Sequence, residues 1–142
     1  MRNQIVPEED SNTIILKWPS IHKSKDSWPD LLNLYIEIIS FLLSKNIYVI
    51  LVEDLKSNFS DDIALANKKI DFDLRSIMNL KINTDDIWIR DYGPFILWDN
   101  INNKYFALDY NYNAYGEKYN YNKDDKFTHH FYQCLNKKSY NL

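Results

Sequence analysis

The spacing of apolar residues along the chain predicts strands and helices in alternation. Residues 13–18 predict a strand that ends at the following proline, because proline cannot donate to a strand ladder. Residues 27–30 form the pattern of a helix start, and residues 47–52 are continuously apolar, as in a strand buried on both faces. Between them, apolar residues recur at helical spacing at Leu31, Leu34, Tyr35, Ile38 and Leu42, widened by Ile39 and Phe41.

The rest of the chain continues the pattern with shorter elements. Acidic pairs at 61–62 and 124–125 are interpreted as helix-start charges, the first capped by Ser60. Strands that alternate with helices indicate an α/β fold, and without a linker-like stretch we expect residues 1–142 to form one domain. The predicted elements are a helix over 60–69, a strand over 76–82, a strand end or turn over 88–91, a strand pair over 94–98 and 104–110, and a helix over 124–135.

Composition narrows the class of protein. The 142 residues are 45% hydrophobic, enough for a packed core, and the net charge of −3 argues against a basic nucleic-acid-binding face. The apolar stretch 31–43 is too short and too polar to span a bilayer, and no apolar run follows the first residues, so we expect no signal peptide and a cytoplasmic location. The single cysteine, Cys134, excludes an internal disulfide and a multi-cysteine zinc site.

The two glycines of the chain each lie in a stretch that could carry chemistry. We expect Gly93 to adopt backbone angles that other residues avoid, and with the proline after it to form a rigid corner. Trp88, Arg90 and Asp91 come just before this corner, and a carboxylate beside an aromatic ring suits a planar cation. Alternatively, Arg90 and Asp91 satisfy each other or nearby backbone, and Trp88 lies in the core.

The second stretch, 107–116, alternates aromatic and amide residues and ends at Gly116. It is either a strand with a polar face followed by a turn, or the lining of a polar pocket. Asp109 within it is either a second partner for a guanidinium or a structural residue at the end of a strand.

Together these stretches resemble the agmatine deiminase family, which is related to the bacterial type of peptidylarginine deiminase. Residues 88–94, WIRDYGP, resemble the W-x-R-D-x-G-P motif of that family. Residues 109–116, DYNYNAYG, are similar to its D-W-x-F-N-A-W-G motif, with tyrosine at three aromatic positions. Weaker similarities cover residues 7–10, 18–19 with Trp28, and 123–126.

The resemblance implies a fold and a reaction. The fold is a five-fold pseudo-symmetric α/β propeller of the pentein type, of which this chain would form about two β-β-α-β units. The reaction hydrolyses a guanidine to a ureido group and ammonia, and agmatine would give N-carbamoylputrescine for putrescine synthesis. No metal or organic cofactor is implied. A cysteine thiolate attacks the guanidinium carbon, a histidine handles protons, and carboxylates hold the guanidinium nitrogens.

The resemblance also assigns site residues. Asp91 matches a substrate-binding aspartate, Trp88 and Arg90 match its wall and support, and Asn113 matches an asparagine at the pocket rim. The family's catalytic histidine, its E-G-G segment and its cysteine would lie after Leu142, so we expect no catalytic residue here. Cys134 is then an ordinary helix residue. His22 lies in the loop after the first strand, and the adjacent His129 and His130 should face different directions and form no ligand pair.

Other interpretations stay open. The chain could be a non-catalytic fragment that binds a cationic ligand or pairs with a complementing C-terminal fragment, a peptidyl-arginine deiminase relative, or a remnant without function. Because part of a propeller exposes strand edges, we expect the isolated chain to fold marginally or to self-associate.

Overall fold

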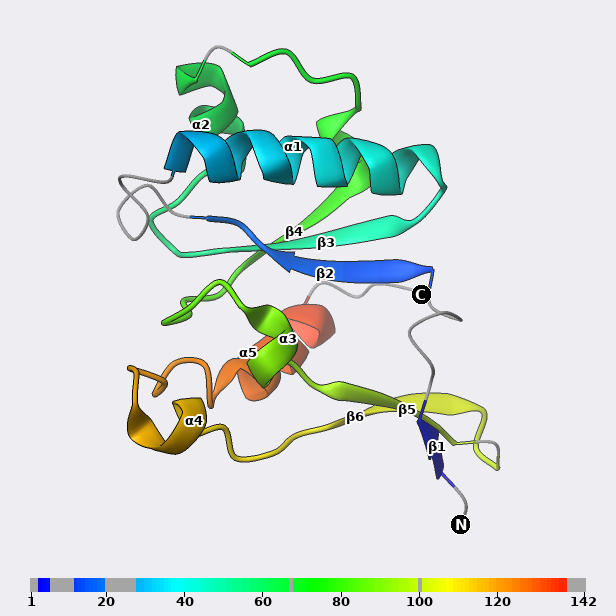
Figure 1. Cartoon of the computed structure of the whole chain (residues 1–142). Coiled ribbons are helices and arrows are strands. Elements are labelled where there is room, and N and C mark those ends of the chain that lie inside the picture. Colours follow the sequence, from blue (N-terminus) through cyan, green and yellow to red (C-terminus); the bar gives the residue numbers. More distant parts are fainter. Residues whose placement is uncertain (1–2, 6–11, 20–27, 67, 100, 138–142) are drawn as a thin grey trace. The chain divides into compact units, whose positions relative to one another are not determined.

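The computed structural model describes residues 3–5, 12–19, 28–66, 68–99 and 101–137, which form two compact units. The parallel unit comprises Asn12–Asn83, and the antiparallel unit combines Met1–Ser11 with Thr84–Leu142. Each unit contains its own three-stranded sheet (Figure 1). Residues 7–10 and His22, for which the sequence raised expectations, lie outside the described residues.

The parallel unit is a β-α-β-α-β layer with the strand order β2-β3-β4. Consecutive parallel strands need right-handed crossovers, so both helices lie on the same face of the sheet (Figure 1). The predicted α/β class and strands over 13–18, 47–52 and 76–82 are thereby confirmed. The elements are β2 (Thr13–Lys17), α1 (Trp28–Ser44), β3 (Tyr48–Glu53), α2 (Phe59–Leu65), the 3-10 helix η2 (Leu74–Ser76) and β4 (Ile77–Lys81).

Helix α1 confirms most of the predicted stripe, since Ile39 and Leu42 are buried and Tyr35 and Ile38 pack against the core, but two of its residues are exposed. Leu34 is 48% exposed and Phe41 is 60% exposed, whereas Leu32 is only 1% exposed. At 100° per residue the buried positions fall on one narrow face, and Leu34 and Phe41 point away from it. The apolar spacing correctly predicted the helix and most of its buried face, but α1 also carries apolar residues on its other side, so the predicted stripe was too wide. The buried residues of α1 are Trp28, Leu32, Ile39 and Leu42.

Trp18, directly after β2, is the centre of the core of the parallel unit. It is fully buried, and the rings of Tyr35 and Phe59 contact it edge-on at centroid distances of 5.9 and 4.6 Å. Its indole N–H donates to Asp62 at 2.7 Å. Asp62 therefore does more than place negative charge at the start of α2, since it also satisfies the one polar atom of a buried tryptophan.

Buried charges join the ends of the strands in this unit. Glu53, at the end of β3, is fully buried and accepts hydrogen bonds from the Phe59 backbone N–H at 2.7 Å and from Lys81 at 3.0 Å. Lys17 and Asp54 form a second ion pair at 3.0 Å. The Glu53 bond fixes where α2 begins, and the cap is Asn58 rather than the predicted Ser60.

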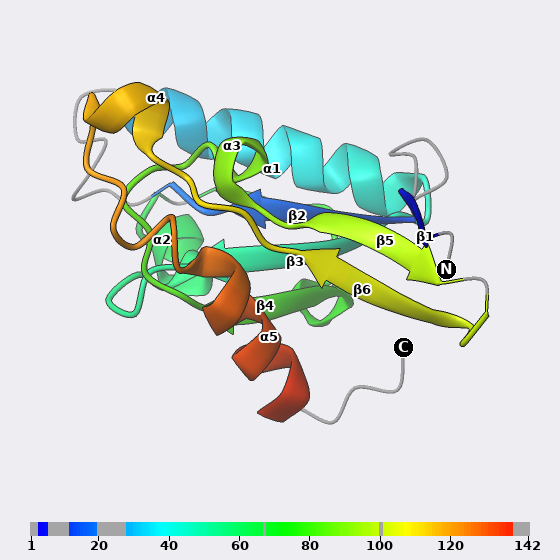
Figure 2. The ribbon, with the colours of Figure 1, turned by 90° about the horizontal axis from the view of Figure 1, so that it is seen from below.

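The antiparallel unit has the strand order β1-β5-β6, and its strand β1 (Asn3–Ile5) was not predicted from the sequence. The predicted pair over 94–98 and 104–110 is confirmed as β5 (Phe95–Asp99) and β6 (Lys104–Leu108). Residues 88–91 were predicted as a strand end or turn, but α3 (Ile89–Tyr92) is a short helix. After β6 the chain leads into α4 (Ala114–Glu117) and then α5 (Phe127–Lys137), which starts later than predicted (Figure 2).

An aromatic cluster forms the core of the antiparallel unit. Tyr92, Phe127 and Phe131 are almost completely buried. Tyr92 contacts Phe127 at 5.5 Å between centroids, and Phe127 stacks on Phe131 at 5.6 Å. Within the described part of the chain, no helix has the length and apolar character that a membrane span requires.

Replacing Lys17 with methionine should destabilise the parallel unit. The side chain of Lys17 is 1% exposed and that of its partner Asp54 is 10% exposed, so the substitution leaves a buried carboxylate without its cation. Breaking a buried ion pair in this way costs about 3–5 kcal/mol. Urea unfolding of Lys17→Met measures the loss, with the exposed lysine in Lys69→Met as the matched control. Equal stabilities of the two variants would contradict the importance of the pair.

Candidate functional site

The corner predicted around Gly93 exists, but for a different reason from the expected one. The buried Tyr92 ring anchors helix α3 in the aromatic core, and the Gly93 N–H donates to the Ile89 carbonyl at 2.7 Å. Gly93 has φ −72°, which any residue can adopt, so the expectation of unusual backbone angles is wrong. A Cβ at this position would lie 2.6 Å from the Ile89 carbonyl oxygen. Glycine is therefore needed because the backbone passes too closely for a side chain.

The second stretch ends in a turn with left-handed backbone angles. Ala114, Tyr115, Gly116 and Glu117 have φ values of 45°, 59°, 81° and 64°. A left-handed conformation costs roughly 1–2 kcal/mol for each residue other than glycine. Asn113 holds the turn, since its side-chain oxygen accepts from the Gly116 N–H at 3.1 Å and its carbonyl accepts from the Glu117 N–H at 2.6 Å.

These two stretches line one pocket in the antiparallel unit, with a volume of about 480 Å³. Trp88 is 64% exposed, so the alternative that placed it in the core is wrong. The lining combines two carboxylates with three aromatic rings, which are the groups that bind a planar cation. Lys118 already lies 5.3 Å from the centre of one of these rings, that of Tyr119. The lining residues are Asp86, Trp88, Asp91, Tyr115 and Tyr119.

Tyrosine hydroxyls fix Asp91 in this pocket. Tyr115 donates to its Oδ2 at 2.7 Å, and Tyr110 donates to its backbone carbonyl at 2.6 Å. The bond to Asp91 raises the pKa of Tyr115, burial raises the pKa of Tyr110, and burial together with the Asp91 charge raises the pKa of Tyr112 to about 12. All three phenols are therefore protonated at neutral pH, and Tyr110 and Tyr115 act as donors.

The four residues expected at the site take different positions. Trp88 and Asp91 line the pocket together. Arg90 is exposed on α3, and Asn113 is exposed and holds the left-handed turn; the described lining includes neither. Asp109 is exposed and accepts from the Tyr110 N–H at 3.1 Å, as a structural residue at the end of a strand would.

Sequence reasoning missed Asp86 and Tyr119 as lining residues. Asp86 could have been found, because it is one of two adjacent acidic residues just before the first motif. Nothing in the sequence distinguishes Tyr119 from the other tyrosines. Cys134 is half-buried on α5 and is not among the described lining residues. The rings of His129 and His130 contact each other edge-on at 5.6 Å, and the described residues contain no group of three potential metal ligands.

The acidic pair 124–125 does not act as a helix-start charge, because α5 begins at Phe127. Asp124 is 1% exposed, and its Oδ1 accepts from the Asp85 N–H at 2.6 Å while its Oδ2 accepts from the Asp86 N–H at 3.2 Å. Asp125 accepts from the Tyr112 N–H at 2.8 Å. The pair thus holds the backbone of both pocket-lining stretches.

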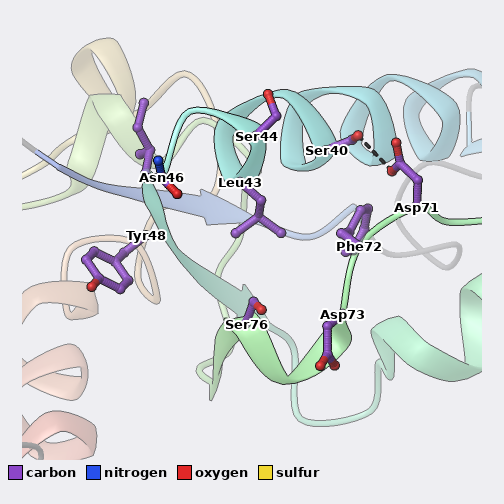
Figure 3. A pocket seen from close by; sticks show the side chains of 10 residues that line it. Ser40, Leu43, Ser44, Asn46, Tyr48, Asp71, Phe72, Asp73 and Ser76 are labelled. Carbon is purple, nitrogen blue, oxygen red and sulfur yellow. Dashed lines mark hydrogen bonds between the residues drawn. The ribbon is translucent and has the colours of Figure 1, made fainter.

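A second hollow, of about 530 Å³, lies in the parallel unit, between the end of α1 and the segment before β4 (Figure 3). Its two carboxylates are already engaged: Asp71 accepts from Ser40 at 2.7 Å, and Asp73 pairs with Arg75 at 2.7 Å. It contains no residue of either candidate stretch, so we assign the candidate site to the antiparallel unit.

Comparison with known families shows which family the chain belongs to. Residues 5–141 match the family described as Porphyromonas-type peptidyl-arginine deiminase. The chain belongs to this family. No curated protein matches the chain.

Solved structures similar to this chain share its fold at low sequence identity. A candidate peptidyl-arginine deiminase superposes with a TM-score of 0.73 and 17% identity, over 96% of this chain and 37% of its own. The agmatine deiminase of C. jejuni has a TM-score of 0.70 and 20% identity, over 96% of this chain and 38% of its own. The agmatine deiminase of Enterococcus faecalis has a TM-score of 0.62 and 15% identity, over 85% of this chain and 32% of its own. The chain thus spans about a third of the length of each of these relatives.

Replacing Gly116 with alanine should destabilise the antiparallel unit through the backbone alone. Its φ is +81°, and no atom lies within 4 Å of where a Cβ would be, so the cost comes from conformation and not from a clash. We expect a loss of about 1–2 kcal/mol in urea unfolding. Ala114→Gly is the matched control, because it relieves a left-handed alanine in the same turn. An unchanged free energy of unfolding in Gly116→Ala would contradict the expected strain.

Asp124 should make stability depend on pH. Burial raises its pKa from 3.8 to about 6, and the charges of Asp85 and Asp86 add to this effect while the two backbone hydrogen bonds oppose it. The folded protein therefore holds a proton that the unfolded chain releases. The contribution of Asp124 to the free energy of unfolding is complete below about pH 4 and is lost as the pH rises through about 6. The free energy of unfolding should fall by about 2 kcal/mol over this range.

Urea unfolding of Asp124→Asn between about pH 4 and 7 measures this effect, because the amide cannot ionise. The stability of the natural protein relative to the variant should fall with rising pH. Asp109→Asn, at an exposed carboxylate, keeps Asp124 and should show the same dependence of stability on pH as the natural protein. Parallel pH profiles for the natural protein and Asp124→Asn would overturn the assignment.

Proposed function

We propose that this chain forms the guanidinium-binding part of a deiminase that acts on agmatine. The observation that carries the proposal is the Asp91 carboxylate, held by Tyr115 at 2.7 Å in a pocket that also contains the exposed ring of Trp88 and a second carboxylate, Asp86. Family membership and the likeness to agmatine deiminase structures support the same chemistry.

The chemistry follows from the groups in the pocket. A guanidinium is planar and presents forked N–H donors, so a carboxylate such as Asp91 receives two of them at once. The face of Trp88 offers a second attraction to the flat cation. Fixed negative charge also keeps the guanidinium protonated, which makes its carbon the electrophile in hydrolysis. The residues of this chain therefore bind, orient and hold the charge of the substrate.

The remaining steps are proposed to use groups outside residues 1–142. A cysteine thiolate would attack the guanidinium carbon, ammonia would leave with a proton handled by a histidine, and water would release N-carbamoylputrescine. No metal or organic cofactor enters this scheme. We further propose that the two units are part of one catalytic domain with a five-fold propeller fold, located in the cytoplasm.

A second candidate is binding without turnover. It is favoured by the groups that line the pocket, two carboxylates and three aromatic rings, which account for binding a cation. In this case the chain binds a cation alone, associates with itself, or pairs with a complementing C-terminal fragment. Peptidyl-arginine presents the same guanidinium and stays an alternative substrate.

Titration with agmatine tests the binding step without requiring turnover. The 142-residue chain should show amide NMR shifts centred on residues 86–91 and 115–119. Asp91→Asn should weaken agmatine binding by about tenfold or more, because hydrogen bonds to charged groups contribute about 1.5–3 kcal/mol. The exposed Asp109→Asn is the control of equal charge change and should bind as the natural chain does.

The controls separate the candidates. A linear diamine of similar length carries the same charge without a guanidinium and should bind more weakly than agmatine. Equal agmatine affinity of Asp91→Asn and the natural chain would contradict the proposed site. Ammonia release by the purified chain would show that the nucleophile lies within it and would exclude binding without turnover.

A further inference from the structure

We propose that Tyr115 is a positioning residue for Asp91, holding one carboxylate oxygen so that the other faces the guanidinium. The inference rests on the proposed function, because it names how the same pocket orients its carboxylate. It concerns a hydroxyl that this chain has where the resembling motif carries tryptophan.

The backbone contacts of Asp91 leave only its side chain to be fixed. Its backbone is held on both sides, since its N–H donates to the Trp88 carbonyl at 2.9 Å and its own carbonyl accepts from Tyr110 at 2.6 Å. Only the side-chain torsions remain. The Tyr115 hydroxyl, 2.7 Å from Oδ2, restricts them. A carboxylate oxygen accepts more than one hydrogen bond, so Oδ2 can still take part in a forked contact together with Oδ1.

The backbone at Tyr115 gives an independent indication. The residue has φ 59° and ψ 44° within the left-handed turn, yet its side chain is 68% exposed. Burial therefore does not account for the strained conformation. Strained residues of this kind cluster at functional sites, where the surrounding structure maintains them. Here the strained turn presents the phenol to the pocket carboxylate.

The first measurement requires no ligand. Selective labelling of the tyrosine rings follows each phenol by NMR as the pH rises. The bond to Asp91 raises the pKa of Tyr115, and Asp86 and Tyr110 act in the same direction. Asp91→Asn should lower that pKa. Tyr121 is the internal control, because it donates to Glu117 at 3.1 Å and is not among the described lining residues of the pocket. Its pKa should be the same in Asp91→Asn as in the natural chain.

The second measurement is agmatine affinity. Tyr115→Phe keeps the ring and removes the hydroxyl, so we expect binding about tenfold weaker. The preference for agmatine over the linear diamine should fall in parallel, a change that a merely structural role would not produce. Tyr121→Phe removes a matched hydroxyl from another carboxylate and should change affinity by less than about twofold. Unfolding by urea confirms that both variants are folded.

Three outcomes decide the matter. The positioning role is supported if Tyr115→Phe, and not Tyr121→Phe, binds agmatine more weakly and less selectively, and if Asp91→Asn lowers the pKa of Tyr115. If Tyr115→Phe binds like Tyr121→Phe while Asp91→Asn loses affinity, the positioning role is overturned and the proposed function stands. If the natural chain does not bind agmatine, both are overturned.

Discussion

The carboxylate of Asp124 is the constraint on which the candidate site depends. It is buried, and both of its oxygens accept backbone N–H bonds from the loop that enters the first motif. Its neighbour Asp125 accepts from the backbone of the second motif at Tyr112. The turn that contains Asp124 and Asp125, just before helix α5, thus holds two segments that are far apart in sequence. The arrangement has an electrostatic cost, because Asp124 is buried beside Asp85 and Asp86, and this cost appears as a pKa of about 6.

Around this anchor, the site combines rigid backbone with exposed side chains. Tyr92 is buried in the aromatic core and fixes α3, while Trp88 at the start of that helix is exposed. The left-handed turn fixes Tyr115 in the same way, with its ring accessible and its hydroxyl on Asp91. A site built in this way is organised before a ligand arrives, so less of the binding free energy is spent on ordering side chains.

Local patterns predicted most of the fold. The continuous apolar run over 47–52 predicted β3, and its residues 49–52 are all buried, as in a strand covered on both faces. The failures have particular causes. Leu34 and Phe41 were wrongly included in the buried face of α1 because α1 also has apolar residues on its exposed side, and only packing shows where the buried face ends. Strand β1 was missed because a three-residue strand has no periodicity to read, and it forms only by pairing with β5, more than 90 residues away.

The sequence by itself determined the family, the alternation of strands and helices, and two motifs, of which the first contributes Trp88 and Asp91 and the second Tyr115 to one pocket. It could do so because spacing and short motifs are local properties of the chain. Only the tertiary structure decided that Gly93 serves a close backbone approach, that Asp124 anchors a loop and does not cap a helix, and that the Tyr115 hydroxyl reaches Asp91. These features depend on atoms 24 to 39 residues apart, or on exact backbone angles, and residue spacing carries no information about either.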